Sequence, residues 1–176
     1  VDLRVIAPVG LPPFPLTRLP RYRPLAALPR RELRRGLTVL RPPFANLPAT
    51  GGRFHAAMLV RALKPVLERL RADFPFDVID AEFFFPDGPA AAALGAHFGV
   101  PVSIKARGAD IHHWGNQPGT ADQVRQAGIA AQGMLAVSEA MREDMVRLGM
   151  PAARIGVHRT GIDRTRFSPV DRAIAK

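Results

Sequence analysis

Charged residues, hydroxyl residues and glycines gather in short segments that directly follow runs of apolar residues. Carboxylates, arginines and exposed helix starts together suit a polyhydroxylated or phosphorylated ligand, because arginine and free backbone N–H groups bind phosphate. Asp and Ser at a helix start can equally be caps, so each residue by itself is weak evidence for a ligand site. The candidate residues are Glu82, Asp87, Gly88, Arg107, Gly108, Asp110, Ser138, Glu139, Arg159, Thr160, Gly161 and Asp163.

Several catalytic and metal-binding motifs are absent from the sequence. It has no G-x-G-x-x-G, no phosphate-binding loop ending in Gly-Lys-Ser/Thr and no His-Glu-x-x-His. With no cysteine, it cannot form disulfides, thiolate zinc sites or a cysteine nucleophile. His112 and His113 are adjacent, and adjacent side chains diverge on a helix or a strand. We therefore expect no metal and no resident cofactor.

The elements that position the candidate residues alternate between strands and helices. Short β-branched runs predict strands at 3–7, 37–40, 77–81, 101–105, 133–137 and 154–158. Helical periodicity predicts helices at 53–73 with a kink or break at Pro65, 88–97 ending at Gly99, 121–131, and 139–148 between a Ser138 cap and Gly149. This alternation predicts an α/β fold, a doubly wound parallel sheet covered on both faces, with ligands at the carboxyl ends of the strands.

The positive charge and the prolines are concentrated near the start of the chain. The 176 residues contain 25 Lys plus Arg against 15 Asp plus Glu, for a net charge of +10, and 18 prolines. Many of both fall in residues 11–36, where proline excludes a long helix or a central strand. Apolar residues such as Phe14 and Leu19 mixed with arginine suit an interface with anionic lipid.

The basic segment has two further interpretations that stay open. The loop can fold back onto its own domain, and a GC-rich coding sequence also produces a chain rich in Ala, Arg, Gly and Pro. A nucleic-acid partner is not expected, because the arginines are scattered and lack interleaved aromatic residues. No apolar run reaches the ~18 to 20 residues of a membrane helix, and the start lacks a signal-peptide pattern. We expect a cytoplasmic location, with peripheral association at the inner membrane face as an alternative.

Ordered motifs between residues 77 and 169 resemble the N-terminal domain of the group 1, or family 4, retaining glycosyltransferases. The Pro- and Arg-rich loop after Pro8 is similar to one branch of this family. The matching segments are Phe76-Asp77-Val78-Ile79-Asp80-Ala81-Glu82, Pro86-Asp87-Gly88, Gly99-Val100-Pro101-Val102, Arg107-Gly108-Ala109-Asp110-Ile111, Leu135-Ala136-Val137-Ser138-Glu139-Ala140-Met141, Ile155-Gly156-Val157-His158-Arg159-Thr160-Gly161-Ile162-Asp163 and Phe167-Ser168-Pro169.

The resemblance implies a B-type fold of two Rossmann-like domains, of which the first holds the acceptor and the second the nucleotide-sugar donor. Residues 1–163 would be the acceptor-binding domain and 164–176 a linker toward a donor domain, whose Glu-x7-Glu signature this sequence lacks. The implied activity is transfer of a hexose, with retention, to a glycan or lipid-linked acceptor in polysaccharide or glycolipid assembly. The fragment alone should be inactive. The alternative is a basic nucleic-acid-binding or non-catalytic interaction module.

The resemblance also assigns roles to the candidate residues. Arg107 and Asp110 would be catalytic, and the other candidates would bind substrate, with Thr160, Gly161 and Asp163 at a hinge facing the donor. Many family members have His where this chain has Arg107, and Asn where it has Thr160. Arginine does not deprotonate near neutral pH, so Arg107 cannot be a general base and its expected role is electrostatic.

The beginning of the chain departs from the family pattern. Residues 1–8 match the second strand of the family fold, so the strand that normally lies at the centre of the sheet has no counterpart here. Unpaired backbone groups inside a sheet are costly. Either residues preceding Val1 supply that strand or another molecule does. We therefore expect weak stability or dimerisation of this chain alone.

Overall fold

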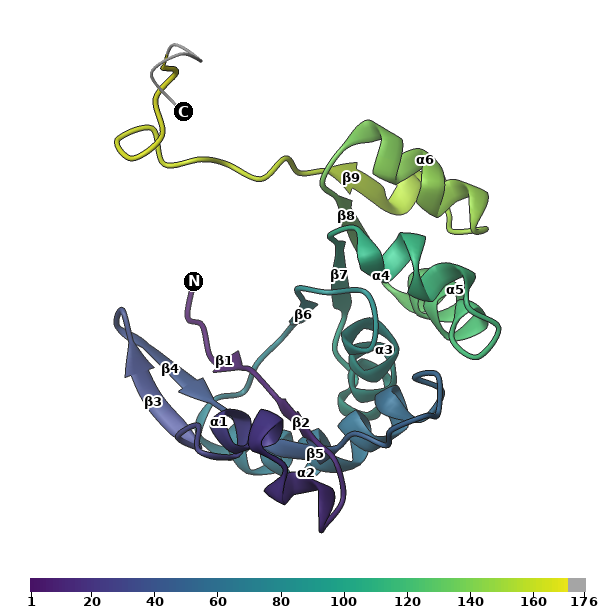
Figure 1. Cartoon of the computed structure of the whole chain (residues 1–176). Helices are drawn as coiled ribbons and strands as arrows, with labels where there is room; N and C mark the ends of the chain where they lie inside the picture. Colours follow the sequence, from purple (N-terminus) through teal and green to yellow (C-terminus); the bar gives the residue numbers. More distant parts are fainter. Residues whose placement is uncertain (171–176) are drawn as a thin grey trace.

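Four parallel strands form the largest sheet of the computed structural model, which describes residues 1–170 (Figure 1). They are β6 (Ile79–Ala81), β7 (Val102–Ala106), β8 (Gly133–Ala136) and β9 (Ile155–Val157), paired in that order. Helices α3 (Asp87–Phe98), α5 (Ala121–Ala130) and α6 (Glu139–Arg147) connect them, and the short elements α4 (Ala109–His112), η3 (Trp114–Asn116) and η4 (Ala152–Arg154) lie between. The predicted α/β fold class is confirmed.

The first part of the chain forms two smaller sheets. Strand β1 (Val5–Ile6) pairs in parallel with β4 (Leu37–Leu40), and β2 (Val9–Leu11) pairs in parallel with β5 (Pro43–Ala45). These pairs are successive pieces of one ribbon, since the amide groups of Ala7 and Val9 donate to Leu40 and Pro42 between them. Pro8 and Pro42 interrupt the ladder because proline has no N–H group.

The ribbon and the four-stranded sheet are not hydrogen-bonded to each other. Within residues 1–170, β6 pairs only with β7, and neither β1 nor β2 pairs with it. Both parts rest on helix α2 (His55–Asp73) and α3, where Ile6, Phe44 and Ile79 pack against one cluster of leucines. Within these residues β6 is therefore an edge strand of the four-stranded sheet.

Helix α2 differs from its prediction in one respect. Pro65 lies inside the helix, which continues without interruption to Asp73, so a break at that residue was a wrong prediction. Leu59, Leu63 and Leu67 are buried on one face, while Pro65 lies on the exposed face. There a carbonyl that loses its helical partner can bond water, and packing of the leucines holds the helix together.

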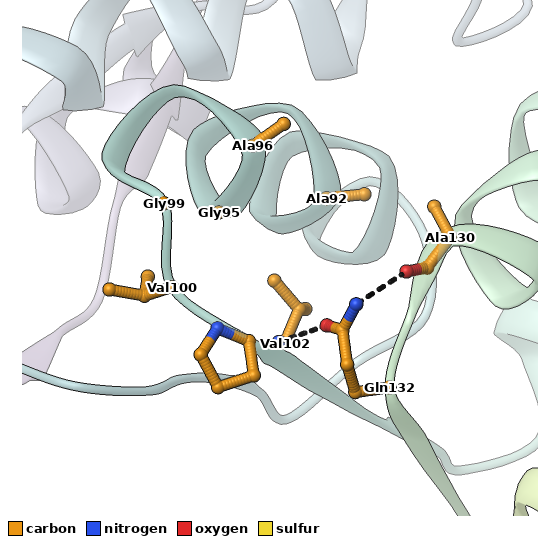
Figure 2. A pocket seen from close by; sticks show the side chains of 9 residues that line it. Ala92, Gly95, Ala96, Gly99, Val100, Val102, Ala130 and Gln132 are labelled. Atoms are coloured by element: carbon orange, nitrogen blue, oxygen red, sulfur yellow. Dashed lines mark hydrogen bonds between the residues drawn. The ribbon is translucent and has the colours of Figure 1, made fainter.

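Helix α3 ends as predicted at Gly99, which has a left-handed φ of +67°. Near this end Gly95 lies so close to β7 that a Cβ would stand 2.3 Å from Val102 Cγ2. A hollow lined by α3, the start of β7 and Gln132 opens here (Figure 2). The amide of Gln132 already bonds Val102 N and Ala130 O. The hollow lies at the amino ends of the strands, the edge opposite the candidate residues.

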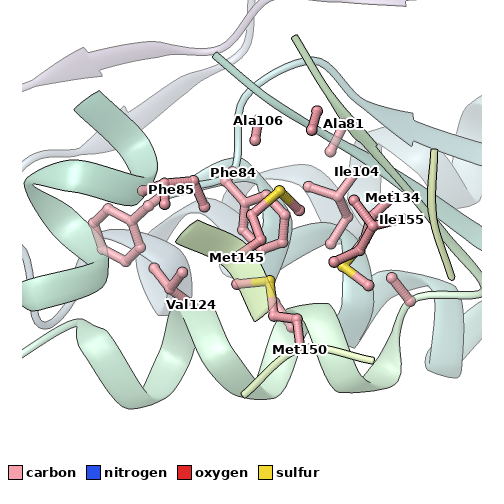
Figure 3. Close-up of a cluster of buried hydrophobic side chains, with 14 of the residues drawn as sticks. Ala81, Phe84, Phe85, Ile104, Ala106, Val124, Met134, Met145, Met150 and Ile155 are labelled. Carbon is pink, nitrogen blue, oxygen red and sulfur yellow. The ribbon is translucent and has the colours of Figure 1, made fainter. Parts of the chain in front are cut away.

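The main hydrophobic core lies between the four-stranded sheet and helices α3 to α6 (Figure 3). Phe84, Ile104, Met134 and Met145 are fully buried in it. The alternate positions on the other face are more open, and Asp80 is exposed. On the same face Lys105 of β7 is only 7% exposed. The segment after β2, where a crossover helix would cover that face, is the proline-rich insert.

This insert consists of short turns and one strand. It contains η1 (Leu16–Arg18), η2 (Pro20–Tyr22), α1 (Arg23–Ala26) and β3 (Arg31–Arg34), which pairs antiparallel with β4 at the outer edge. The hairpin turns at Arg35 and Gly36, whose φ values are both positive. As predicted, the insert has no long helix and no central strand, whereas β3 was not predicted. No helix in residues 1–170 has the length and apolar character needed to cross a membrane.

Candidate functional site

Two loops at the carboxyl edge of the sheet are held together by the carboxylate of Asp110. The Asp110 side chain is fully buried, and its Oδ2 accepts a hydrogen bond from Phe84 N at 2.8 Å. Its Oδ1 accepts from Gly108 N at 2.7 Å, and both oxygens lie 3.1 Å from Arg107 N. Backbone donors thus surround this carboxylate, and it fixes the loop after β6 against the loop after β7.

An exposed ion pair crosses the same two loops. Arg107 Nε donates to the carbonyl oxygen of Glu82 at 2.8 Å, and Arg107 Nη2 pairs with the Glu82 carboxylate. The side chains are 42% and 59% exposed, so both are accessible at the edge of the sheet. Gly108 follows with φ of +143°, a conformation that residues with a Cβ rarely adopt. The structure therefore brings together the predicted residues Glu82, Arg107, Gly108 and Asp110.

Asp87 begins helix α3 next to this pair of loops. Burial raises the pKa of its carboxyl group from 3.8 to about 6, and the negative charge of Asp110 acts in the same direction. Gly88 follows and lets the helix approach β7, since a Cβ there would lie 3.3 Å from Ile104 side-chain atoms. A carboxyl group of this kind can exchange a proton near neutral pH or bond a hydroxyl group.

An aromatic group beside the site was not predicted. His55, the first residue of α2, stacks on Phe85 with ring centroids 6.5 Å apart, and Phe85 lies 5.1 Å from Trp114. Burial lowers the pKa of His55, which favours its neutral form. Gly52 lies against Trp114, since a Cβ would stand 2.7 Å from the indole ring. The three rings are far apart in the sequence. The only sequence feature that could have pointed to this group is the single tryptophan of the chain.

Ser138 and Glu139 occupy the predicted helix start after β8. Ser138 Oγ accepts a hydrogen bond from Met141 N at 3.1 Å, so the predicted cap is confirmed. Glu139 lies in the first turn, where negative charge is favoured by the helix dipole, and it is exposed. The hydroxyl of Ser138 is used as a cap, and Glu139 is available at the surface.

The last group of candidates lies beyond β9. Arg159, Thr160, Gly161 and Asp163 are exposed in a segment that leads away from the sheet (Figure 1). Asp163 accepts hydrogen bonds from the side chain and the amide of Thr165, which lower the pKa of its carboxyl group. No hydrogen bond within residues 1–170 joins this segment to the loops around Asp87. The structure therefore does not bring these residues to the rest of the site.

A second pair that was not predicted links β7 to the end of β9. Lys105 is only 7% exposed, and its Nζ lies 3.0 Å from Nδ1 of His158. A lysine ammonium only donates, so Nδ1 of this histidine accepts and its other ring nitrogen carries the hydrogen. The contact crosses β8 on the open face of the sheet. Sequence position gave no sign of it, because the residues are 53 positions apart.

Metal-binding side chains are not clustered in the part of the chain that the structure describes. No group of three or more His, Asp or Glu residues within 1–170 is arranged to hold a metal ion. The adjacent histidines contact different partners: His112 Nε2 lies 2.7 Å from an Asp144 carboxylate oxygen, and His113 packs edge-on against Trp114. The polar groups of the site are thus carboxylates, one accessible arginine and backbone N–H groups.

A parallel α/β sheet with polar groups at its carboxyl edge defines a Rossmann-like domain of the kind that binds ligands at that edge. The family model of Glycosyltransferase Family 4 matches residues 20–166. The chain belongs to this family.

Two further comparisons agree with this assignment. The sequence is 27% identical over 172 residues to a Bacillus subtilis (strain 168) protein named "Putative teichuronic acid biosynthesis glycosyltransferase TuaC", covering 95% of this chain and 43% of that protein. The crystal structure of Anabaena Alr3699/HepE in complex with UDP has a TM-score of 0.53 at 15% identity, over 72% of this chain and 32% of that chain. The latter supports the fold. The chain thus spans less than half the length of these relatives.

Proposed function

We propose that this chain is the acceptor-side domain of a glycosyltransferase that moves a hexose from a nucleotide-sugar to a glycan or lipid-linked acceptor, with retention of configuration. The observation that carries the proposal is the family match over residues 20–166. The relative named for teichuronic acid biosynthesis supports a role in polysaccharide assembly. In this proposal residues 1–163 form the domain and 164–176 lead toward a donor-binding domain; residues 171–176 lie outside the described part.

Arg107 is the proposed electrostatic group of the reaction. Its positively charged guanidinium is accessible, so it can stabilise the leaving diphosphate or bind an anionic acceptor. The two contacts with Glu82 restrain its orientation before substrate arrives. Glu82 keeps unoccupied acceptor capacity, because it is 59% exposed, and can bond a sugar hydroxyl.

The resemblance implies a catalytic Asp110, but because its side chain is fully buried it acts in this proposal as a positioning residue. Its carboxylate is buried and accepts backbone hydrogen bonds from both loops, so it places Arg107 and Glu82 without touching substrate. Asp87, with a pKa of about 6, is the group that can exchange a proton with an acceptor hydroxyl. Gly108, where no atom lies within 4 Å of an added Cβ, gives the substrate close access to the backbone of its loop, and Gly88, buried against β7, positions the start of α3 beside it.

The remaining candidates contribute outside this pair of loops. Ser138 and Glu139 present the start of α6 to the ligand edge. Arg159, Thr160, Gly161 and Asp163 are proposed to approach the donor when the second domain is present, since they lie in the segment that leads toward it. The partners are then a nucleotide-sugar, a glycan or lipid-linked acceptor and the donor-binding domain. No metal or resident cofactor is required by this arrangement.

The experiment is sugar transfer by the protein that joins this domain to a donor-binding domain of the same family. Arg107→Ala should lower kcat/KM about 100-fold or more, which is the usual cost of removing one group that stabilises transition-state charge. Arg125→Ala is the matched control, because the hydrogen bond and ion pair of the Arg125 side chain within residues 1–170 go to Asp122 on its own helix. Full turnover by the Arg107→Ala protein would refute the electrostatic role. Absence of transfer to every glycan and lipid-linked acceptor, with salt-sensitive binding of RNA or DNA instead, would refute the proposed function.

A further inference from the structure

The insert between β2 and β4 exposes apolar side chains together with arginines. Within residues 14–37, seven large apolar side chains are between 38% and 75% exposed; they are Phe14, Leu16, Leu19, Leu25, Leu28, Leu33 and Leu37. We call the exposed side chains of residues 14–37 the insert surface. The insert packs on its own domain through β3 and α1, as one of the two alternatives expected, yet these apolar side chains remain exposed.

The charge of the insert surface is almost entirely positive. Residues 11–37 contain seven arginines and one acidic residue, Glu32, and that carboxylate pairs with Arg41 outside this segment. None of the seven arginines forms an ion pair with another residue in the described chain. Instead Arg18 lies over the Phe14 ring at 4.8 Å and Arg21 over the Tyr22 ring at 4.7 Å. The excess of positive charge is thus available to a partner.

The insert surface is also anchored to the domain. Pro12 is buried, α1 packs against β2, and β3 pairs along its length with β4. Arg41 Nη2 lies 2.6 Å from Glu32 Oε1, and this ion pair links β3 to the residue that follows β4. The exposed leucines and arginines therefore stand on short ordered turns and an edge strand (Figure 1). A partner would meet them without first ordering a long loop.

We propose that the insert surface binds an anionic lipid bilayer, with arginines at the head groups and Phe14 and Leu33 entering the interface. An amphipathic surface of this composition suits a bilayer, because apolar side chains gain from leaving water while arginines bond phosphate oxygens. A nucleic acid would engage the charge but would leave scattered leucines in water. The proposal is independent of sugar transfer, so vesicle binding and activity can fail separately.

The test is co-sedimentation of the full 176-residue chain with vesicles of phosphatidylcholine alone or mixed with phosphatidylglycerol. Binding is expected only with the anionic vesicles, and it should weaken sharply toward 1 M salt, where the Debye length falls to ~3 Å. The triple change Arg18→Gln, Arg21→Gln and Arg23→Gln should weaken binding on the order of 100-fold, since each arginine near the surface contributes about one kcal/mol.

Matched variants separate this surface from net charge. Arg61→Gln, Lys64→Gln and Arg69→Gln remove the same charge from the exposed face of α2 and should leave binding nearly unchanged. Phe14→Ser with Leu33→Ser should weaken binding about tenfold or more, since burying such side chains contributes more than one kcal/mol. Ile129→Ser with Val146→Ser, at exposed sites elsewhere, should not.

Three results would overturn the proposal: no preference for anionic vesicles, equal weakening by the two charge triples, or no effect of the Phe14 and Leu33 changes. Tight binding of an oligonucleotide without vesicle binding would assign the surface to nucleic acid instead. Far-ultraviolet circular dichroism of each variant checks that it keeps the fold.

Discussion

The pKa of Asp87 leads to a prediction about stability that has a definite sign. A carboxyl group whose pKa rises from 3.8 to about 6 on folding binds its proton more tightly in the native state. Its stabilising contribution is fully present below pH 3.8 and is lost as the pH rises through about 6. At neutral pH the ionised group is buried at a cost, so Asp87→Asn should stabilise the domain.

The size of the effect follows from the shift. A difference of about two pKa units, at about 1.4 kcal/mol each, corresponds to about 3 kcal/mol. The free energy of unfolding of Asp87→Asn, measured relative to the wild-type chain, should therefore increase by about 3 kcal/mol as the pH rises from roughly 3.5 to 7.5. Most of this increase should fall between pH 4 and 6. Burial is the larger cause of the shift, so Asp110 need not change for the gain to appear.

Urea unfolding at several pH values measures this directly. Trp114, the only tryptophan, packs against Phe85 two residues before Asp87 and reports the local structure by fluorescence. Asp122→Asn is the matched control, since Asp122 lies in the first turn of α5 with a side chain that is 75% exposed. A difference between Asp87→Asn and wild type that stays constant from pH 4 to 7.5 would refute the reasoning.

Three further predictions concern the frame of the site. Asp110→Asn should destabilise the domain by about 2 to 4 kcal/mol in urea unfolding, because the amide turns an N–H2 group toward buried backbone donors. A loss below about 0.5 kcal/mol would contradict the conclusion that the Asp110 carboxylate holds the two loops together. Gly108→Ala should lower the stability of the domain by about 1 to 2 kcal/mol through its φ of +143° alone, since no atom lies within 4 Å of the added methyl group. Gly133→Ala is the control: that position is equally open but lacks the positive φ, so the change should be nearly neutral. Sedimentation velocity should show self-association of the 176-residue chain, or urea unfolding a stability below about 5 kcal/mol, because within residues 1–170 β2 pairs only with β5 and β6 only with β7, which leaves strand edges open. A stable monomer would contradict this.

Local sequence was sufficient for most of the elements. The start of α6 needs only the Ser138 hydroxyl and the apolar period that follows, and the end of α3 needs only Gly99, because both signals act within one helical turn. The break expected at Pro65 was wrong because leucines packed along the whole of α2 outweigh one missing hydrogen bond. Strand β3 was missed because its residues are mostly charged and its pairing with β4 depends on a turn of two positive φ values.

The sequence by itself determined the α/β class, the loops that carry Asp87 and Arg107, and a basic surface near the start of the chain. These follow from periodicity, residue type and motif order, which are local properties of the chain. Only the tertiary structure decided that Asp110 joins two loops 26 positions apart, that His55 stacks on Phe85, and that the sheet is divided beside β6. Burial and charge at those points come from residues distant in sequence, and packing alone brings them into contact.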